Sequence, residues 1–570
     1  MSRIDWIILA LTLGATVMYG VYKSRTTRNL DGYFRGNREM PWYLVLLSIM
    51  GTQASAVTFL SAPGQAYTDG MRFVQYYFGL PLAMVVLCIT FVPIFRKLNL
   101  YTAYEFLEKR FDVRTRTLTS ALFMISRGLS TGISVYAPSI ILSSLLGWNI
   151  YWTNAFMGGL LIIYTVSGGA KAVAHTQKLQ LIIVFIGLFI AAYTCVNMLP
   201  EGIGFSEALH IGGKMGKMNV ISTGITDNGF DWTDRFNIFS GVIGGFFLAL
   251  SYFGTDQSQV GRFLTAKSDK ESKLGLLMNG VVKVPMQFLI LLIGILLFTF
   301  YQFNQSPLLF NTLPLERART HAVYGDSVRA LEKQHVLLAE EKKLAVTELS
   351  GELKTQGNVD TAVKRLAYIN ARQEVLRREV RGMIKQSEVG GETNDTNYIF
   401  LRFVIDHLPR GLIGLLIAVI FLAAWGSIAA ALNSLASASV VDIHKKFIQK
   451  DLSEEQDYKL SKWYSLFWGL FCVATAMFVP GMGSLIEAVN VLGSWFYGII
   501  LGIFLVAFYI KTIGGRAIFW GAIISQILVL LIYWQSEVAW LWLNVIGAAL
   551  VIGISFVLNL FSARLNTQAQ

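Results

Sequence analysis

Long apolar stretches recur along the whole chain, and short segments between them hold most of the charged residues. A helix needs about 20 mostly apolar residues to cross a bilayer, whereas a transmembrane barrel shows alternating segments of about ten residues. The pattern predicts an all-α polytopic membrane protein. About 13 transmembrane helices are expected, at residues 4–23, 42–62, 73–95, 118–146, 150–168, 176–197, 236–256, 275–302, 411–443, 462–482, 484–509, 516–536 and 538–562.

The composition agrees with this prediction. Hydrophobic residues make up 54% of the 570 residues and charged residues only 15%, whereas an ordinary soluble protein has about 25% charged residues. The net charge of +12 does not indicate a nucleic-acid partner, because Lys and Arg gather in short loops, as membrane topology requires. The lipid bilayer is the expected surrounding. An enzyme is the least favoured class, because no nucleophile–base set is visible.

The Lys and Arg residues also predict the orientation of the spans. With the N-terminus outside, the inward segments hold 25 Lys and Arg residues, and the short outward segments hold about 5. Cytoplasmic loops of membrane proteins carry such an excess. We therefore expect a multi-pass protein of the cell membrane (plasma or inner) with its N-terminus outside and its C-terminus in the cytoplasm.

One outward segment, residues 303–408, is much longer than the others. Two stretches within it, 326–354 and 358–388, are rich in Ala, Glu, Lys, Leu and Arg, with apolar residues at helical spacing and a turn signal between them. They predict an antiparallel helical hairpin outside the membrane. The hairpin would separate spans 1–8, in residues 1–302, from spans 9–13, in residues 409–570. It would serve as a solvated cap or as a docking surface for a protein partner.

Small and polar residues crowd two of the predicted spans. The second span reads SIMGTQASAVTFLSAPGQAY from residue 48, and the ninth reads AAWGSIAAALNSLASAS from residue 423. Small residues favour close helix packing, but the backbone of a broken helix is also tolerated where it lines a cavity. Carbonyls of an unwound second span and hydroxyls of the ninth would make a hard-oxygen site suited to Na⁺.

Ionisable residues inside the spans mark candidate functional positions. Arg127 and Lys283 lie about nine and eight residues into their spans. Each could pair with a carboxylate, form a salt bridge or snorkel to the interface. Asp256, Asp442 and Glu487 lie near span ends, where interfacial or structural pairing is expected.

Seven blocks spread over the chain, outside residues 303–400, carry a family resemblance. They are GYFRGNREMPW at 32–42, SAVTFLSAPGQAYTDG at 55–70, LYTAYEFLEKRF at 100–111, YAPSIIL at 136–142, TVSGGAKAVAHTQKLQ at 165–180, GTDQSQVGRFLTAKS at 254–268 and ALNSLASASVVDIHKK at 431–446. Together they resemble the sodium:solute symporter family, which includes sodium–sugar, proline, iodide, multivitamin and sialic acid transporters.

The resemblance implies a leucine-transporter-like core of two inverted five-helix repeats, spans 2–6 and 7–11, with spans 1, 12 and 13 at the periphery. It implies a secondary active symporter that imports a small polar organic solute by alternating access, with Na⁺ as the coupling ion. The alternative is a transporter-like membrane sensor that binds a partner through the 303–408 hairpin.

The resemblance implies that the five ligand positions of the family's sodium site correspond to five residues of this chain. Its backbone carbonyls map to Gly51 and Ala54 on the second span and to Ala423 on the ninth. Its two hydroxyl groups map to Gly426 and Ser427. One hydroxyl ligand is therefore missing, because glycine has no side chain. Either a water molecule or Thr52 replaces it, or the sodium affinity is low.

A further sodium site of some relatives is not expected here. Those relatives use an Asp before the sixth span and two hydroxyl groups on the ninth. The corresponding residues of this chain are Gln177, Ala429 and Ala430. Neutral side chains without hydroxyls make a poor cation site, so we expect one Na⁺ per transport cycle.

Fewer of the family's solute-binding residues are found at the corresponding positions of this chain. Of five sugar contacts in sodium–sugar transporters, three are absent, at Thr58, Tyr77 and Ala249. A sugar site of that kind is therefore not expected, and a small organic anion or another polar metabolite is favoured. The predicted solute-binding residues are Gln53, Ser55, Thr58, Tyr77, Tyr252, Lys283 and Asn490, with Arg127 as a further intramembrane charge.

Overall fold

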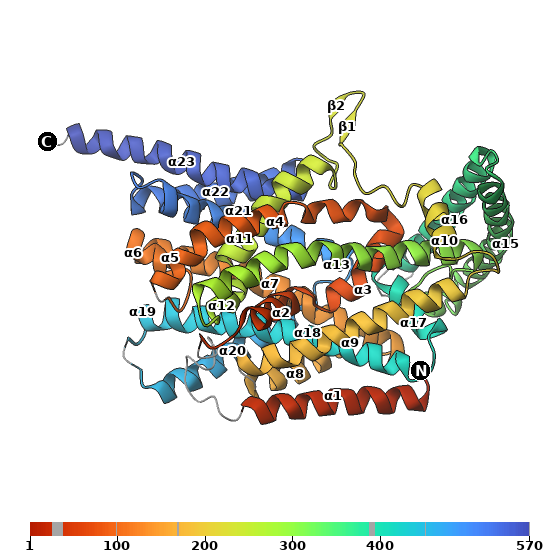
Figure 1. Cartoon of the computed structure of the whole chain (residues 1–570), viewed down its shortest axis with the longest axis horizontal. Helices are drawn as coiled ribbons and strands as arrows, with labels where there is room; N and C mark the ends of the chain where they lie inside the picture. The colour runs from red at the N-terminus through yellow and green to blue at the C-terminus, as the bar shows by residue number, and fades with distance from the viewer. Residues whose placement is uncertain (25–37, 99, 168–169, 387–393, 451, 569–570) are drawn as a thin grey trace.

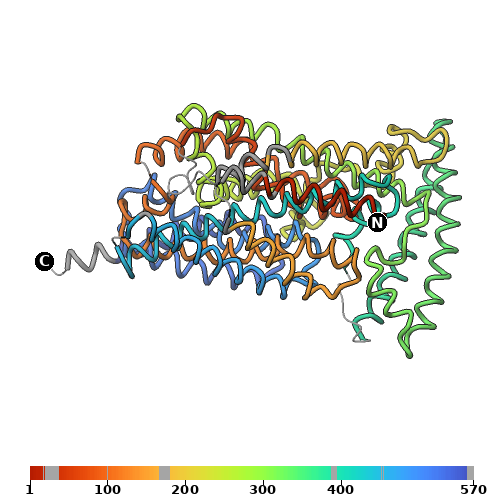
Figure 2. Tube along the Cα trace, turned by 90° about the horizontal axis from the view of Figure 1, so that it is seen from below, coloured from red at the N-terminus to blue at the C-terminus, as the bar shows by residue number. Residues whose placement is uncertain are grey.

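The computed structural model describes residues 1–24, 38–98, 100–167, 170–386, 394–450 and 452–568. Long helices run side by side in one bundle, and a pair of helices, α15 (Gly325–Thr355) and α16 (Asp360–Gln386), stands across one end of it (Figure 1). The N-terminus lies at the end that carries this pair. The C-terminus lies at the opposite end, as the view in Figure 2 also shows.

The described residues of the N-terminal third are mostly helical. It contains α1 (Arg3–Ser24), α2 (Trp42–Gln53), α3 (Ala56–Asp69), η3 (Gly70–Tyr77), α4 (Leu80–Val86), η4 (Leu87–Phe91), α5 (Val92–Lys97), α6 (Glu105–Arg110), α7 (Val113–Leu146), α8 (Ile150–Ser167) and α9 (Ala170–Asn197). Because η3 is a 3₁₀-helix and η4 a π-helical turn, the predicted span 73–95 is not one regular helix.

The described residues that follow are also mostly helical and include a two-stranded antiparallel sheet, in which Ile225 lies opposite Phe230. Up to the hairpin it contains α10 (Phe205–Lys214), β1 (Ile225–Thr226), β2 (Gly229–Phe230), η5 (Ser240–Gly244), α11 (Gly245–Thr255), α12 (Gln257–Leu264), α13 (Asp269–Phe303) and α14 (Thr312–Arg319). After the hairpin follow η6 (Thr396–Tyr398), α17 (Ile399–His407), α18 (Leu412–Ala438), η7 (Ser439–His444), α19 (Lys445–Phe447), α20 (Glu454–Ala476), α21 (Leu485–Tyr509), α22 (Gly515–Gln535) and α23 (Trp540–Gln568).

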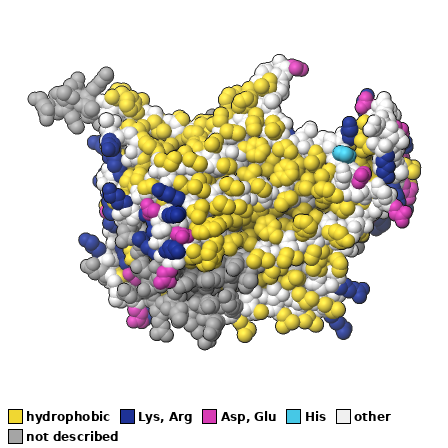
Figure 3. Space-filling view, viewed as in Figure 1, with side chains coloured by type: hydrophobic (Ala, Val, Ile, Leu, Met, Phe, Trp, Pro, Cys, Tyr) yellow, Lys and Arg dark blue, Asp and Glu magenta, His cyan; other side chains and the backbone are white. Residues whose placement is uncertain are grey.

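Apolar side chains cover the outside of the bundle. A belt of hydrophobic residues occupies the visible face between two ends that carry Lys and Arg (Figure 3). Among the described residues, eight helical segments are long and apolar enough to cross a membrane, and two further apolar helices are shorter. The protein is an all-α polytopic membrane protein, as predicted. The count of thirteen spans stays a prediction.

The second predicted span is interrupted, which its small and polar residues had indicated. α2 ends at Gln53 and α3 begins at Ala56. The Ala54 amide donates to the Met50 carbonyl at 2.6 Å, and Ser55 is extended, with φ −88° and ψ 178°. Two helix ends therefore meet inside the bundle.

A second interruption was not predicted from the sequence. The seventh span is predicted to end at Asp256, but the chain continues into α12 after this single non-helical residue, whose ψ is 117°. The Asp256 carboxylate caps α12 by accepting from Ser258 N at 2.8 Å and from Ser258 Oγ at 2.6 Å. Of the two roles expected for Asp256, the structure shows structural pairing.

α15 and α16 form an antiparallel hairpin whose ends lie within two residues of the predicted arms. Its inner apolar residues, among them Leu349, Leu366 and Ile369, are continuous with the main core of the bundle. Asn370 Nδ2 also donates to Gln302 Oε1 of α13 at 3.1 Å. The hairpin is therefore packed on the bundle rather than separated from it by solvent.

Candidate functional site

The break between α2 and α3 leaves two predicted sodium ligands without partners. Within the described residues, no hydrogen bond reaches the carbonyl oxygen of Gly51 or of Ala54. Buried backbone carbonyls are nearly always paired, and the C-terminal end of a helix carries partial negative charge. The end of α2 would therefore stabilise a cation.

The predicted ligands on the other wall lie on α18, which is continuous. Ala423 and Ser427 are 5% and 6% exposed. Ser427 Oγ donates to the Ala424 carbonyl at 2.9 Å. A hydroxyl oxygen has two lone pairs in addition to its donor, so this bond leaves Ser427 able to act as a ligand.

Gln177 of α9 fills the space between these two helices. A Cβ on Gly51 would lie 2.8 Å from Gln177 Cδ, and a Cβ on Gly426 would lie 3.3 Å from Gln177 Cγ. The Gln177 side chain is 1% exposed, and neither amide atom has a hydrogen-bond partner in the described structure. An unpaired buried amide is costly. Gln177, which stands where some relatives have a carboxylate, thus places an unpaired buried amide between α2 and α18.

A central cavity of about 100 Å³ lies next to the first break. Its lining comes from α3, η3, α4, α7, α11 and α21 and from the residues at the break. Six of the seven predicted solute-binding residues line it, together with Arg127; the six are Gln53, Ser55, Thr58, Tyr77, Tyr252 and Asn490.

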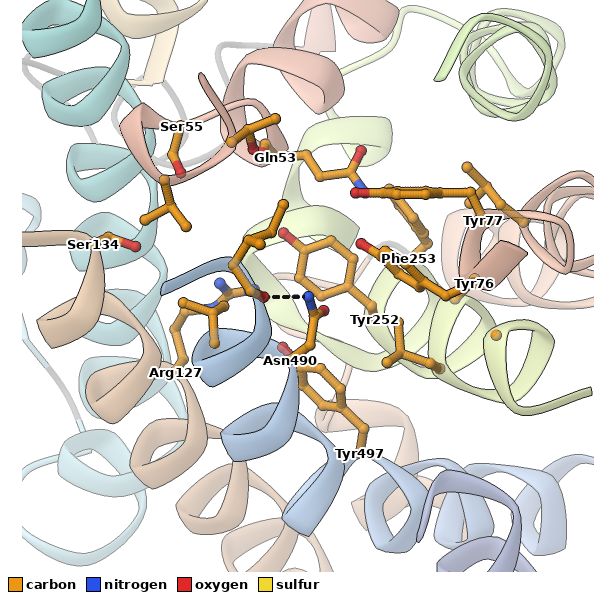
Figure 4. Close-up of a pocket in the computed structure, with 18 residues that line it drawn as sticks. Gln53, Ser55, Tyr76, Tyr77, Arg127, Ser134, Tyr252, Phe253, Asn490 and Tyr497 are labelled. Atoms are coloured by element: carbon orange, nitrogen blue, oxygen red, sulfur yellow. Dashed lines mark hydrogen bonds between the residues drawn. The ribbon is translucent and has the colours of Figure 1, made fainter. Parts of the chain in front are cut away.

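Polar side chains of several helices converge on this cavity. Gln53 extends toward Tyr77, and Tyr76, Tyr252 and Asn490 lie on facing sides (Figure 4). Asn490 Nδ2 donates to the Ile486 carbonyl at 2.7 Å, the dashed line in the figure. The Tyr76 and Tyr77 rings lie 3.9 Å apart between centroids. The cavity therefore offers hydroxyl and amide groups on a largely aromatic frame.

Lys283, the seventh predicted solute-binding residue, does not line the cavity. Its side chain is 0% exposed, and its ammonium lies 5.6 Å from the centroid of the Tyr77 ring. No hydrogen-bond partner for its Nζ is found in the described structure. Direct pairing of Lys283 with a solute is therefore not supported by this arrangement, because Tyr77 lies in the lining and Lys283 does not.

Arg127 of α7 is paired within the protein. It forms a salt bridge with Asp256, the residue at the second break, and the two side chains are 10% and 1% exposed. The guanidinium also lies 5.2 Å from the centroid of the Tyr252 ring, and Arg127 Nε has no partner in the described structure. Arg127 therefore stabilises the second break through its ion pair with Asp256, and its Nε–H remains available as a donor.

Three polar lining residues were not among the predicted ones: Tyr76, Ser134 and Tyr497. Ser134 follows Arg127 by two helical turns of α7, so the helical period could have placed both on one face. Tyr76 adjoins the predicted Tyr77. No comparable signal exists for Tyr497, whose position depends on how α21 packs.

Two interrupted helices beside a buried polar cavity, within a bundle of apolar helices, define a secondary transporter. The sodium:solute symporter family matches residues 33–336 and 377–525, and the chain belongs to this family. The match extends further into the hairpin region than the sequence blocks indicate. Within the hairpin it leaves only residues 337–376 unmatched.

Individual relatives agree with this assignment. The sodium/sialic acid symporter of Proteus mirabilis (strain HI4320) is 26% identical, over 96% of this chain and 93% of the relative. The sodium-coupled monocarboxylate transporter 1 of Xenopus laevis is 23% identical, over 88% of this chain and 67% of the relative. A solved substrate-bound, outward-open Na⁺-coupled sialic acid symporter has the same fold, with a TM-score of 0.75 and 24% identity over 98% of both chains.

Proposed function

We propose that this protein is a sodium-coupled symporter that imports a small polar organic solute, with one Na⁺ per cycle, and that it is not an enzyme. One observation carries the proposal. The partnerless carbonyls of Gly51 and Ala54 lie at a helix break whose neighbouring residues, Gln53, Ser55 and Thr58, line the solute cavity. An ion and a solute that share one unwound segment affect each other's binding.

The proposed sodium site uses neutral oxygens from three helices. The Gln177 amide oxygen takes the place of the hydroxyl that is missing at Gly426. It is buried and has no partner in the described structure, and the Gln177 side chain approaches Gly426, with its Cγ 3.3 Å from a Cβ built there. The full set comprises the carbonyls of Gly51, Ala54 and Ala423, the hydroxyl of Ser427 and the amide oxygen of Gln177.

The proposed solute is a small monoanion. The described cavity lining holds one cation, Arg127, and no carboxylate. Arg127 Nε is an unused donor, and burial makes a hydrogen bond to a charged group strong. Relatives are named for sialic acid, monocarboxylates and iodide, which are all anions. The small cavity favours a solute of few atoms.

The transport cycle follows from linkage. Na⁺ at the end of α2 orders the α2/α3 break, and this ordering positions Ser55 and Thr58 for the solute. The bound pair then favours rearrangement of the bundle, so that the cavity opens to the other side. We place the hairpin and the N-terminus outside the cell and the C-terminus in the cytoplasm of a plasma or inner membrane, because Lys and Arg predominate in the predicted inward loops.

Uptake into proteoliposomes tests the proposal. An inward Na⁺ gradient, but not a K⁺ gradient, should drive accumulation of a labelled small carboxylate. One Na⁺ with a monoanion carries no net charge, so voltage should have no effect, and a tenfold Na⁺ gradient should support about tenfold accumulation. A neutral solute would also gain about 2.3 kcal/mol per 100 mV. Accumulation without Na⁺, or no accumulation of any solute in a broad set, would contradict the proposal.

A further inference from the structure

A second and larger cavity lies where the hairpin meets the bundle. This hairpin cavity has a volume of about 350 Å³, whereas the central cavity has about 100 Å³. Its lining includes Tyr67 and Thr68 at the end of α3, Gln302 at the end of α13, and residues of both hairpin helices. A volume of this size is typical of ligand pockets.

Lys342 of α15 is the unusual residue in this cavity. Its side chain is 2% exposed, and its ammonium donates to Gln373 Oε1 of α16 at 2.8 Å. In the part of the chain that the structure describes, no carboxylate lies within ion-pair distance of Lys342. A buried ammonium that faces only a neutral amide is unfavourable. Lys342 therefore lacks a counter-charge.

Gln373 is itself incompletely paired. It is 2% exposed, and its Nε2 has no hydrogen-bond partner in the described structure. The ammonium of Lys342 and the amide nitrogen of Gln373 are both hydrogen-bond donors. Two adjacent buried side chains thus offer unused donors in the lining of one cavity, which is the pattern that an acceptor-rich anion would satisfy.

The other charged residues of the cavity do not neutralise Lys342. Arg381 is paired with Glu374 at 3.0 Å and with Asp395 at 2.9 Å, and Arg377 lies 3.8 Å from Glu374. Among the described residues, the lining holds two carboxylates and the four basic side chains Lys217, Lys342, Arg377 and Arg381. Basic side chains therefore outnumber carboxylates in the described lining.

We propose that the hairpin cavity binds a small carboxylate anion, held by the Lys342 ammonium and the Gln373 amide. Lys342 and Gln373 both belong to the segment 337–376 that the family does not match, so the site is a property of this chain's insertion. The described linings of the hairpin cavity and the central cavity have no residue in common. Because its lining includes the end of α3, the anion would also contact the broken helix.

The charge state of Lys342 makes the site sensitive to pH. Burial and the neighbouring Arg377 lower the pKa of Lys342 to about 7. The charged or titratable groups around it are Tyr67, Lys217, His335, Glu374, Arg377, Arg381 and Asp395. Burial lowers the pKa of His335 to about 4. Lys342 is charged below pH 7 and loses its charge above it, so affinity should fall roughly tenfold between pH 6 and pH 8.

Calorimetric titration of the purified full-length protein with acetate and lactate tests the site. Sodium is replaced by choline at constant ionic strength, so that the central site is not engaged. We expect saturable binding that Lys342→Met weakens at least tenfold. Lys343→Met, an exposed neighbour on the same helix, is the matched control and should bind as the wild type does.

A second variant keeps the test decisive if Lys342→Met does not fold. Gln373→Glu supplies an internal carboxylate to Lys342, so it should abolish acetate binding and raise the midpoint of thermal unfolding. Wild-type affinity in either variant, or no saturable binding by the wild type, would overturn the proposal. Binding of sulfate or phosphate with Lys342 dependence, but not of carboxylates, would overturn the assigned ligand class.

Discussion

The two interrupted helices of the bundle are stabilised in opposite ways. The break between α2 and α3 has no charged residue from Ser48 to Ser61, and its Gly51 and Ala54 carbonyls have no partner among the described residues. The break between α11 and α12 contains its own carboxylate, Asp256, which caps α12 and forms an ion pair with Arg127 of α7.

This difference indicates which break should respond to an ion. At the second break, the Arg127 side chain already neutralises the buried carboxylate of Asp256, so this break needs no diffusible ion to balance its charge. At the first break the helix end presents partial negative charge and, among the described residues, carbonyl oxygens that are paired with neither a donor nor a side-chain cation. A diffusible cation bound at the first break would supply the positive charge that Arg127 supplies at the second break. Sodium should therefore order the first break and leave the second unchanged.

The largest effect is expected from removing the internal charge of the second break. Asp256→Asn retains a capping side chain but leaves the Arg127 guanidinium buried without a counter-charge, at a cost of roughly 3–5 kcal/mol. We expect a strongly lowered midpoint of thermal unfolding and no transport. The double variant Arg127→Gln with Asp256→Asn should recover much of the stability. Wild-type stability of Asp256→Asn alone would show that charge pairing does not hold this break.

A smaller but clear effect is expected at the first break from Gly51→Ala. The added methyl would lie 2.8 Å from Gln177 Cδ, so Gln177 or α2 must shift, at a cost of about 1–3 kcal/mol. The sodium concentration for half-maximal uptake should rise about tenfold, because two proposed ligands move. Gly14→Ala on α1, with no atom within 4 Å of the added methyl, is the control. Equal sodium dependence in both variants would place the ion elsewhere.

The next largest effect on sodium dependence is expected from removing the hydroxyl ligand, Ser427. Ser427→Ala removes one of five proposed oxygen ligands. The loss should weaken the free energy of sodium binding by about 1 kcal/mol, so the half-maximal sodium concentration should rise several-fold. Ser434→Ala removes a hydroxyl of the same helix that bonds the Ala430 carbonyl at 2.9 Å, and it should leave sodium dependence unchanged. Normal sodium dependence of a well-expressed Ser427→Ala protein would remove α18 from the site.

The smallest effect is expected from Gln177→Met, which keeps the volume of the side chain but removes its oxygen. Sodium affinity should fall two- to five-fold, since a weak neutral ligand is lost. The free energy of unfolding without sodium should rise slightly, because an unsatisfied buried amide disappears. Gln526→Met on the outer helix α22 is the control. Higher sodium affinity in Gln177→Met would show that the amide obstructs the ion instead of binding it.

The sequence predicts much of this arrangement where a local pattern carries the information. Gly51 and Ser55 within an apolar span predict the first break, and the apolar spacing of residues 326–354 and 358–388 predicts the hairpin. Six of the seven expected solute-binding residues line one cavity. Membership of the sodium:solute symporter family confirms the family that the sequence blocks indicate.

The features that were missed depend on contacts between distant residues. Arg127 and Asp256 are 129 positions apart, so neither hydropathy nor spacing could reveal their pairing. For the same reason Asp256 is predicted as the end of a span, although the chain continues as a helix beyond it. Lys283 is predicted to face the solute, but the rotation of α13 directs it behind Tyr77, and periodicity alone does not fix that rotation. Hydropathy also carries no information on the 3₁₀ and π segments η3 and η4.

The central claim is that one sodium ion, bound at the α2/α3 break, drives the import of one solute. The most direct test is the ratio of labelled sodium to labelled solute taken up by proteoliposomes during the first turnovers. The structure predicts a ratio near one and a sodium Hill coefficient near one, because Gln177, Ala429 and Ala430 provide neither the carboxylate nor the hydroxyls of a further site. A ratio near two would contradict this account and require a second ion site.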